Sequence, residues 1–210
     1  VPGVSPAKVA VIGGGVVGSN AIFIATGMGG DVTVIDHDIR RLSEIDTQYK
    51  SLITTRFSNQ TNLEEEIVKA DLVIGAVLVP GAEAPKLVTS EMVKHMKRGA
   101  VIVDVAIDQG GCCETSQPTT HDAPTFVVDE IVHYCVANMP GAVARTSTFA
   151  LNNATLPFAL RIADMGVKEA LKTDSNLMAG LNVHAGQLTY EAVAKAQERE
   201  FTPAAEALSI

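Results

Sequence analysis

A short apolar run that ends in a glycine cluster constrains the fold of this chain more than any other feature. Residues 8–13 read Lys-Val-Ala-Val-Ile-Gly, which is typical of a buried strand. The glycine cluster Gly13-Gly14-Gly15-Val16-Val17-Gly18 opens a helix-like stretch over residues 16–27, and a second apolar run follows at Asp31–Asp36. This order predicts two parallel strands joined by a right-handed helical crossover.

The alternation continues along the chain. Further strands are expected at residues 51–57, 71–77, 100–106, 125–128 and 134–137. Helices are expected at residues 39–49, at 61–70 with Thr61 or Asn62 as the cap, and at 90–97, closed by Gly99. The sequence therefore predicts an α/β fold, a doubly wound Rossmann-type parallel sheet with helices on both faces.

The pattern changes after about residue 145. Residues 148–165 form a long helical run with no strand after it, and residues 187–200 are expected to form another helix. We therefore expect residues 1–147 to be the sheet domain and residues 148–210 to be a helical segment of a second domain. The chain starts with Val1-Pro2-Gly3, without methionine, and reaches a strand by Lys8. We interpret it as part of a longer protein that lacks its N-terminal segment.

Composition removes several classes of function. Sixteen basic and 24 acidic residues give a net charge of −8, so nucleic acids and anionic membrane surfaces are poor partners. No apolar run has the length of a membrane span. The three cysteines, Cys112, Cys113 and Cys135, argue against a disulfide framework and favour a reducing cytoplasm. They lack partners at zinc-ligand spacing, so no metal is expected.

The glycine cluster matches the Gly-x-Gly-x-x-Gly pattern of dinucleotide-binding loops. Gly13 allows the tight turn, Gly15 lets the backbone approach a pyrophosphate, and Gly18 lets helix and strand pack closely. The N-terminus of the following helix attracts the phosphates. Asp36, at the end of the second strand, can accept hydrogen bonds from the adenosine ribose and repels a 2′-phosphate. The expected cofactor is NAD, although two arginines in the next helix leave NADP open.

A second cluster lies at the end of the strand expected at residues 100–106. Asp108 follows this strand and precedes Gly110-Gly111. Ligands of open α/β sheets bind at the carboxyl ends of the strands. The carboxylate either holds a substrate or transfers a proton there, or it merely caps the loop. Position alone leaves both readings open.

Several long stretches of the chain resemble bacterial alanine dehydrogenases. They are GAVLVPGAEAPKLV at 75–88, IDQGGC at 107–112, PTTHDAPTF at 118–126, HYCVANMPGAVARTST at 133–148 and ALNNATLPF at 150–158. The related NAD(P) transhydrogenase α subunits share the fold and the glycine loop. However, they typically carry a glutamate and Gly-Gly-Asn where this chain has Asp108 and Gly-Gly-Cys, and a Leu-Pro-Ser-Arg-type motif at residues 137–140. The resemblance therefore favours the dehydrogenases.

The resemblance implies NAD-dependent, reversible conversion of L-alanine and water to pyruvate and ammonium. It implies that Asp108 is the active-site aspartate. It places Asp36, Arg41 and Ser58 at the adenosine end of NAD, and Val77 and Leu78 along the cofactor. It places the walls beside the nicotinamide at Val105, Ala106, Ile107, Val136, Ala137, Asn138 and Met139. The glycine loop adds five more expected cofactor-binding residues, namely Gly13, Gly15, Val16, Val17 and Gly18. Gln117 departs from the family, where arginine is common before Pro-Thr-Thr.

The substrate-binding arginine and lysine of the family, and its catalytic histidine, lie in an N-terminal segment that this sequence does not contain. The expected partners are L-alanine and pyruvate as substrates, and other copies of the chain, because the family usually forms hexamers. Two functions stay open. The chain is either the NAD-binding and C-terminal part of an alanine dehydrogenase, or an NAD-binding module without activity of its own, such as a truncated product or a transhydrogenase-like domain.

Overall fold

The computed structural model describes residues 1–79 and 83–209. The described residues divide into two compact units. The first unit comprises residues 1–79 and 83–139, and the second begins at residue 140. The sequence pattern predicted a boundary a few residues later, after residue 147.

The first unit contains a seven-stranded sheet. In spatial order its strands are β3 (Ile53–Phe57), β2 (Asp31–Asp36), β1 (Lys8–Ile12), β4 (Leu72–Gly75), β5 (Val101–Asp104), β7 (Ile131–Tyr134) and β6 (Thr125–Val128). All neighbours from β3 to β7 pair in parallel, which confirms the predicted Rossmann-type fold. The edge strand β6 is the exception, because it pairs antiparallel with β7.

A tight turn explains why β6 departs from the parallel arrangement. Asp129 and Glu130 both have positive φ angles, 49° and 64°, as the central residues of a two-residue hairpin turn do. The turn returns the chain at once, so β7 begins at Ile131. The strand predicted at residues 134–137 was therefore placed too late.

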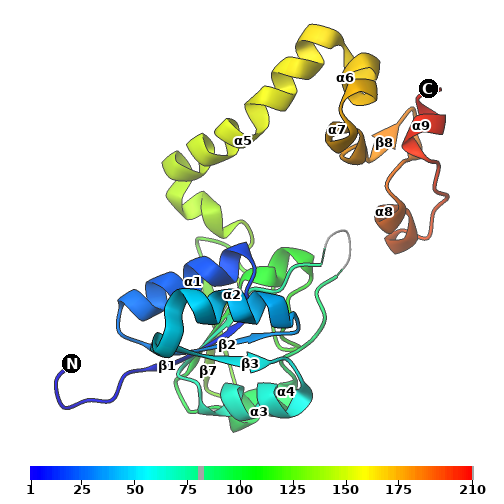
Figure 1. Ribbon diagram of the computed structural model, residues 1–210. Helices are drawn as coiled ribbons and strands as arrows, with labels where there is room; N and C mark the ends of the chain where they lie inside the picture. Colours follow the sequence, from blue (N-terminus) through cyan, green and yellow to red (C-terminus); the bar gives the residue numbers. More distant parts are fainter. Residues whose placement is uncertain (80–82, 210) are drawn as a thin grey trace. The chain divides into compact units, whose positions relative to one another are not determined.

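Helices cover both faces of the sheet (Figure 1). They are α1 (Val16–Gly27), α2 (Ile39–Tyr49), α3 (Gln60–Lys69) and α4 (Ser90–His95), with short 3₁₀ turns at η1 (Lys50–Leu52) and η2 (Val105–Gln109). Helices α1 and α2 pack on one face through Ile22 and Ile45, against Val11 among others. Helices α3 and α4 pack on the other face through Ile67 and Val93. Successive residues of β1 point to opposite faces, and both faces are buried.

Capping explains where the predicted ends shift. The side chain of Asn59 accepts a hydrogen bond from Asn62 N at 2.8 Å and caps α3. The predicted caps, Thr61 and Asn62, lie inside the first turn instead. Helix α4 ends at His95, before Gly99. Strand β5 stops at Asp104, because the side chain of this residue accepts a hydrogen bond from Ala106 N and starts the turn η2.

The second unit begins within the turn η3 (Met139–Val143). It contains α5 (Ala144–Met165), α6 (Val167–Thr173), α7 (Ser175–Ala179), β8 (Val183–His184), β9 (Gln187–Leu188), α8 (Glu191–Ala196) and α9 (Ala204–Ala207). The long helix predicted at residues 148–165 is confirmed as part of α5. The prediction of an all-helical segment was wrong, because β8 and β9 form a hairpin across Ala185-Gly186, both with positive φ. The helix predicted at residues 187–200 is accordingly reduced to α8.

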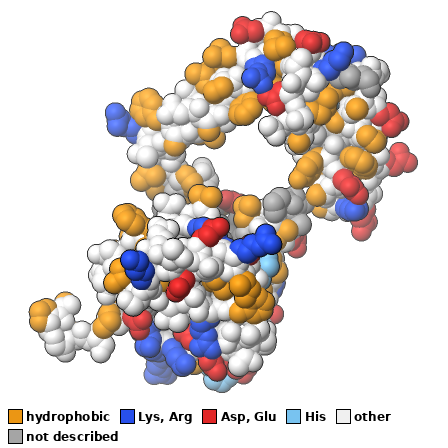
Figure 2. Space-filling model, in the orientation of Figure 1, with side chains coloured by type: hydrophobic (Ala, Val, Ile, Leu, Met, Phe, Trp, Pro, Cys, Tyr) orange, Lys and Arg blue, Asp and Glu red, His pale blue; other side chains and the backbone are white. Residues whose placement is uncertain are grey.

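Helix α5 has no buried residue, and apolar side chains such as Phe149, Leu151 and Leu160 are more than half exposed. Figure 2 shows further apolar side chains at the surface of both units. Among the helices that the structure describes, none combines the length and the apolar character needed to cross a membrane.

Candidate dinucleotide-binding site

A cleft of about 610 Å³ opens beside the carboxyl ends of β1, β2 and β4. Strands β1 and β4 are neighbours, but the helices α1 and α4 that follow them cover opposite faces of the sheet. This is the topological switch point, where open α/β sheets bind ligands. The residues of the cleft that the sequence predicted to bind a cofactor are Gly13, Gly15, Val16, Val17, Asp36, Ser58, Val77 and Leu78.

The three glycines of the motif differ in the space around them. A Cβ on Gly13 would lie 2.6 Å from the carbonyl oxygen of Ala76, and this residue also has a φ of +97°. A Cβ on Gly18 would lie 1.8 Å from the carbonyl oxygen of Gly13. A Cβ on Gly15 would meet nothing within 4 Å. Gly13 and Gly18 are therefore required for packing, whereas Gly15 faces open space that a ligand can approach.

The N-terminus of α1 has no side-chain cap. Helices α2, α3 and α4 have side-chain caps from Asp38, Asn59 and Thr89, whereas the N-cap residue of α1 is Gly15, which has no side chain. The first N–H groups of a helix need a partner, and an anion supplies one that the helix dipole also favours. Around this helix end the apolar side chains of Val16 and Leu78 are 82% and 73% exposed. Exposed apolar groups beside an uncapped helix end suit an amphipathic anionic ligand.

Asp36 joins the second strand to the glycine loop. Its carboxylate accepts hydrogen bonds from Gly14 N at 2.6 Å and from Asp38 N at 2.8 Å, and the ring nitrogen Nδ1 of His37 lies 3.4 Å away. Each carboxylate oxygen can accept more than one hydrogen bond, so capacity for a ribose hydroxyl is left. Ser58 lies nearby, because its N–H donates to the carbonyl oxygen of Asp36 at 2.8 Å.

Arg41 lies beneath the glycine loop and does not line the cleft. Its Nε donates to the carbonyl oxygen of Gly14, its Nη2 donates to Ser19 Oγ, and its Nη1 pairs with Glu44, each at 2.6 Å. The guanidinium group therefore braces the loop from α2. Its predicted place at the adenosine end of the cofactor stays a prediction.

The residues predicted as nicotinamide walls follow two other strands at the same sheet edge. Val105, Ala106, Ile107 and Asp108 form most of η2 after β5, and Val136, Ala137, Asn138 and Met139 follow β7, the neighbour of β5. Asp108 is exposed, whereas Ala106, Ile107 and Val136 are buried. None of these eight residues lines the 610 Å³ cleft. The structure thus brings them to the expected edge, beside the cleft.

Three residues that sequence reasoning did not select connect these parts. The amide of Gln109 both donates to the carbonyl oxygen of Val79 at 3.0 Å and accepts from Val79 N at 3.2 Å. Lys86 Nζ donates to the carbonyl oxygens of Gly110 and Gly111, at 2.5 and 2.8 Å. Asp104 is fully buried. One feature of the sequence could have drawn attention to this set, because Asp104 is a charged residue inside the apolar run of residues 100–106.

The three cysteines are free and buried, close to Asp104 and Ser116. Burial raises the pKa of all three thiols above the ordinary value, and the charge of Asp104 raises them further. These thiols are therefore protonated and poor nucleophiles. Within residues 1–79 and 83–209, no group of histidine, cysteine or acidic side chains is arranged to hold a metal ion.

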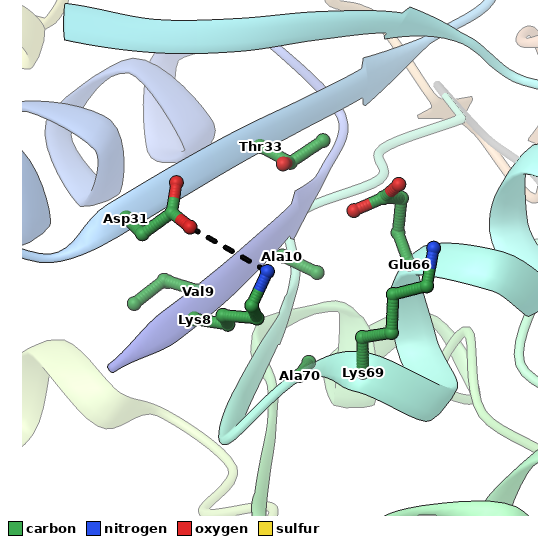
Figure 3. Close-up of a pocket in the computed structure, with 8 residues that line it drawn as sticks. All are labelled: Lys8, Val9, Ala10, Asp31, Thr33, Glu66, Lys69 and Ala70. Carbon is green, nitrogen blue, oxygen red and sulfur yellow. Dashed lines mark ion pairs between the residues drawn. The ribbon is translucent and has the colours of Figure 1, made fainter. Parts of the chain in front are cut away.

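A second hollow lies at the opposite end of the strands, between β1, β2 and α3 (Figure 3). It holds about 20 Å³, which is room for one water molecule. Lys8 reaches across its rim toward Asp31, at 3.6 Å, and both side chains are about half exposed. Such a pair contributes little stability. The size of this hollow excludes a nucleotide.

Comparison with known proteins identifies the family of the chain. Residues 1–191 match the family model described as "Alanine dehydrogenase/PNT, C-terminal domain". The chain is 62% identical over 205 residues to the alanine dehydrogenase of Halomonas elongata, covering 98% of the chain and 55% of that protein. It is 58% identical over 209 residues to the alanine dehydrogenase of Mycolicibacterium smegmatis, covering 100% of the chain and 56% of that protein.

Solved structures give the same result. An L-alanine dehydrogenase superposes with a TM-score of 0.86 at 50% identity, over 94% of this chain and 55% of that one. A transhydrogenase from Sinorhizobium meliloti superposes with a TM-score of 0.59 at 34% identity, over 69% of this chain and 41% of that one. The chain thus spans a little over half the length of the curated relatives it matches. This family is NAD-dependent, which confirms the expected cofactor at the level of the family. The chain belongs to the alanine dehydrogenase/PNT C-terminal domain family.

Proposed function

We propose that this chain is the NAD-binding and C-terminal part of an enzyme that reversibly converts L-alanine, water and NAD to pyruvate, ammonium and NADH. Residues 1–147 form the NAD-binding domain in this proposal, and residues 148–210 belong to the substrate domain. The observation that carries it is the cleft at the switch point. There the uncapped start of α1, the open space over Gly15 and the carboxylate of Asp36 lie together.

The residues of the cleft divide the binding task. The first N–H groups of α1 would hold the pyrophosphate, with Gly15 permitting the close approach. Asp36 and Ser58 would hold the adenosine ribose, Val77 and Leu78 would contact the middle of the cofactor, and Arg41 would support this end through the loop. Bound NAD supplies the acceptor for the hydride that leaves the Cα atom of alanine.

Asp108 and the ends of β5 and β7 would form the substrate side. Residues 105–107 and 136–139 would flank the nicotinamide, and their buried side chains would fix the backbone that does so. Asp108, exposed at the start of the loop, would orient the substrate or exchange a proton with it. We also propose that the enzyme forms a homo-oligomer, specifically a hexamer. We further propose that it acts in the cytoplasm, because three free thiols persist in a reducing compartment.

A second candidate function is an NAD-binding module with no activity of its own. One observation favours it for the isolated chain. Among the described residues that line the cleft, none is lysine or arginine. A carboxylate substrate needs charged donors, and the nearby Arg41 and Lys86 are engaged with backbone carbonyl groups. Under this reading the substrate-binding cations come from a segment outside these 210 residues.

Titration with the reduced cofactors tests the proposed function. NADH fluorescence should show binding to the chain and a clear preference over NADPH, because Asp36 disfavours a 2′-phosphate. Asp36→Ala should weaken NADH binding by about 1–3 kcal/mol, the contribution of charge-assisted hydrogen bonds. Asp31→Ala, at the other end of the same strand, is the matched control and should bind as the parent chain does. Equal affinities of the parent chain for NADH and NADPH would refute the role of Asp36.

A further inference from the structure

A fully buried carboxylate lies beneath the segment that carries Asp108. Asp104, the last residue of β5, has no exposed surface. Its Oδ1 accepts from Ala106 N at 3.2 Å and from Cys112 Sγ at 3.6 Å, and its Oδ2 accepts from Cys113 N at 3.1 Å and from Ser116 Oγ at 2.7 Å. Burying a carboxylate is costly unless hydrogen bonds compensate for the lost water. Here four donors surround it, and each comes from residues 106–116.

Neighbouring glycines leave room for this carboxylate. A Cβ on Gly111 would lie 2.7 Å from Asp104 Oδ2, and Gly111 also has a φ of +78°. A Cβ on Gly75 would lie 3.2 Å from Asp104 Oδ1 and 2.3 Å from Cys112 Sγ. Strand β4 and the segment after η2 thus both close around Asp104. The segment cannot shift without breaking these hydrogen bonds.

The same segment is tied to the wall of the cleft. Gln109 makes two hydrogen bonds with the backbone of Val79, which lines the cleft. Ala84 N donates to the carbonyl oxygen of Gln109 at 2.9 Å, and Lys86 holds the next two carbonyl groups. These contacts join residues 105–113, which we call the Asp108 loop, to Val79, Ala84 and Lys86, and none of them involves the glycine loop or Asp36.

We propose that Asp104 is a buried positioning residue, which folds the Asp108 loop back onto β5 and so sets the place of Asp108 and of the nicotinamide wall. The proposal rests on the proposed function for the role of Asp108, and it assigns Asp104 no contact with substrate or cofactor. Charge on Asp104 matters because all four neighbours donate. An amide in its place presents N–H groups to donors on one side, whichever way it is oriented.

Asp104→Asn in the full 210-residue chain tests the proposal in two ways. Hydrogen exchange measured by mass spectrometry should show the amides of the Asp108 loop exchanging roughly 10- to 100-fold faster, while those of β1 and α1 exchange unchanged. NADH should bind about tenfold more weakly, and ADP-ribose, which lacks the nicotinamide, should bind as before. A general loss of structure would instead weaken the binding of NADH and of ADP-ribose by similar factors.

Asp71→Asn is the matched control, because Asp71 is a partly exposed aspartate that also accepts backbone and side-chain hydrogen bonds, just before β4 and therefore at the opposite end of the strands. It should leave the exchange of the Asp108 loop and both affinities unchanged. If Asp104→Asn does not fold, Ser116→Ala removes one of the four donors and should give the same pattern at smaller size.

Unchanged exchange in the Asp108 loop, or an equal loss of NADH and ADP-ribose binding, would overturn the proposal. If the parent chain binds neither ligand, the proposed function fails instead. In that case the exchange measurement alone decides whether Asp104 holds the loop.

Discussion

Substitutions at two glycines of the Gly-x-Gly-x-x-Gly motif should have different effects. A substitution at Gly18 should lower stability, whereas one at Gly15 should abolish NADH binding. Gly18 lies in α1 where the helix crosses β1, and an added Cβ would come within 1.8 Å of the carbonyl oxygen of Gly13. To restore even the 3.0 Å that real Cβ atoms keep, helix and strand must separate by at least about 1.2 Å. That shift would loosen the packing of Ile22 and Ile45 in the core cluster that α1 and α2 cover.

The magnitude follows from two opposing effects. Alanine in a helix interior is about 1 kcal/mol more favourable than glycine. Overpacking a close contact typically costs about 1–3 kcal/mol, and more where the obstacle is backbone, which cannot change rotamer. Because the obstacle at Gly18 is backbone, we take a cost of about 2–4 kcal/mol, so that after the gain of about 1 kcal/mol Gly18→Ala should lower the free energy of unfolding by about 1–3 kcal/mol. Gly15→Val adds a side chain to open space, so its unfolding free energy should stay within about 1 kcal/mol of the parent.

Urea unfolding followed by circular dichroism, together with NADH titration, separates the two variants. Gly15→Val should unfold nearly as the parent does but bind no NADH, because its side chain occupies the place of the pyrophosphate. Gly18→Ala should unfold at a lower urea concentration than the parent, and its folded fraction should still bind NADH. A stable Gly18→Ala would refute the close-contact argument. Unchanged NADH affinity in folded Gly15→Val would show that the loop is only a turn.

Three further predictions concern other residues. Burial lowers the pKa of His133, so the folded state favours its neutral form, and stability should fall as the pH drops below the unfolded value of about 6.5. His133→Asn should flatten the dependence of the urea midpoint on pH in that range. The cysteines should react with a thiol reagent in urea but not in the native chain at neutral pH, and fast native labelling would contradict their burial. The isolated chain should show no alanine-dependent reduction of NAD, whereas in a longer protein that supplies the N-terminal segment, Asp108→Asn should lower kcat far more than it weakens NAD binding.

The sheet and the glycine loop could be predicted because local sequence determines them. Apolar runs of the right length mark β1, β2 and β5, and each is followed by helix or turn residues. The errors occur where a few residues with unusual backbone geometry decide the path. Asp129-Glu130 and Ala185-Gly186 are two-residue turns with positive φ, and in each only one residue, Asp129 or Gly186, is of a type that such turns favour. Consequently the strand predicted at residues 125–128 is confirmed as β6, but its antiparallel pairing with β7 and the hairpin β8–β9 were missed.

The candidate site could be predicted only in part, for a related reason. The motif identifies Gly13, Gly15 and Asp36, because their roles depend on positions along one strand–helix–strand unit. The hydrogen bonds of Gln109 with Val79 join residues thirty positions apart, and no spacing rule links them. Likewise, no spacing rule predicts that the guanidinium group of Arg41 holds Gly14, Ser19 and Glu44.

The charges at the carboxyl edge of the sheet also bear on how the chemistry is divided. The edge presents the carboxylates of Asp36 and Asp108, backbone N–H groups and apolar surface, while the cationic groups of Arg41 and Lys86 are held by backbone carbonyl groups. The N–H groups suit the pyrophosphate of a dinucleotide, because they need no charged side chain to bind an anion. They do not suit a small carboxylate that must be held at the far, nicotinamide end. Under the proposed function, the cations for that task come from residues beyond the described cleft, and we expect this chain to bind NADH without turning over alanine.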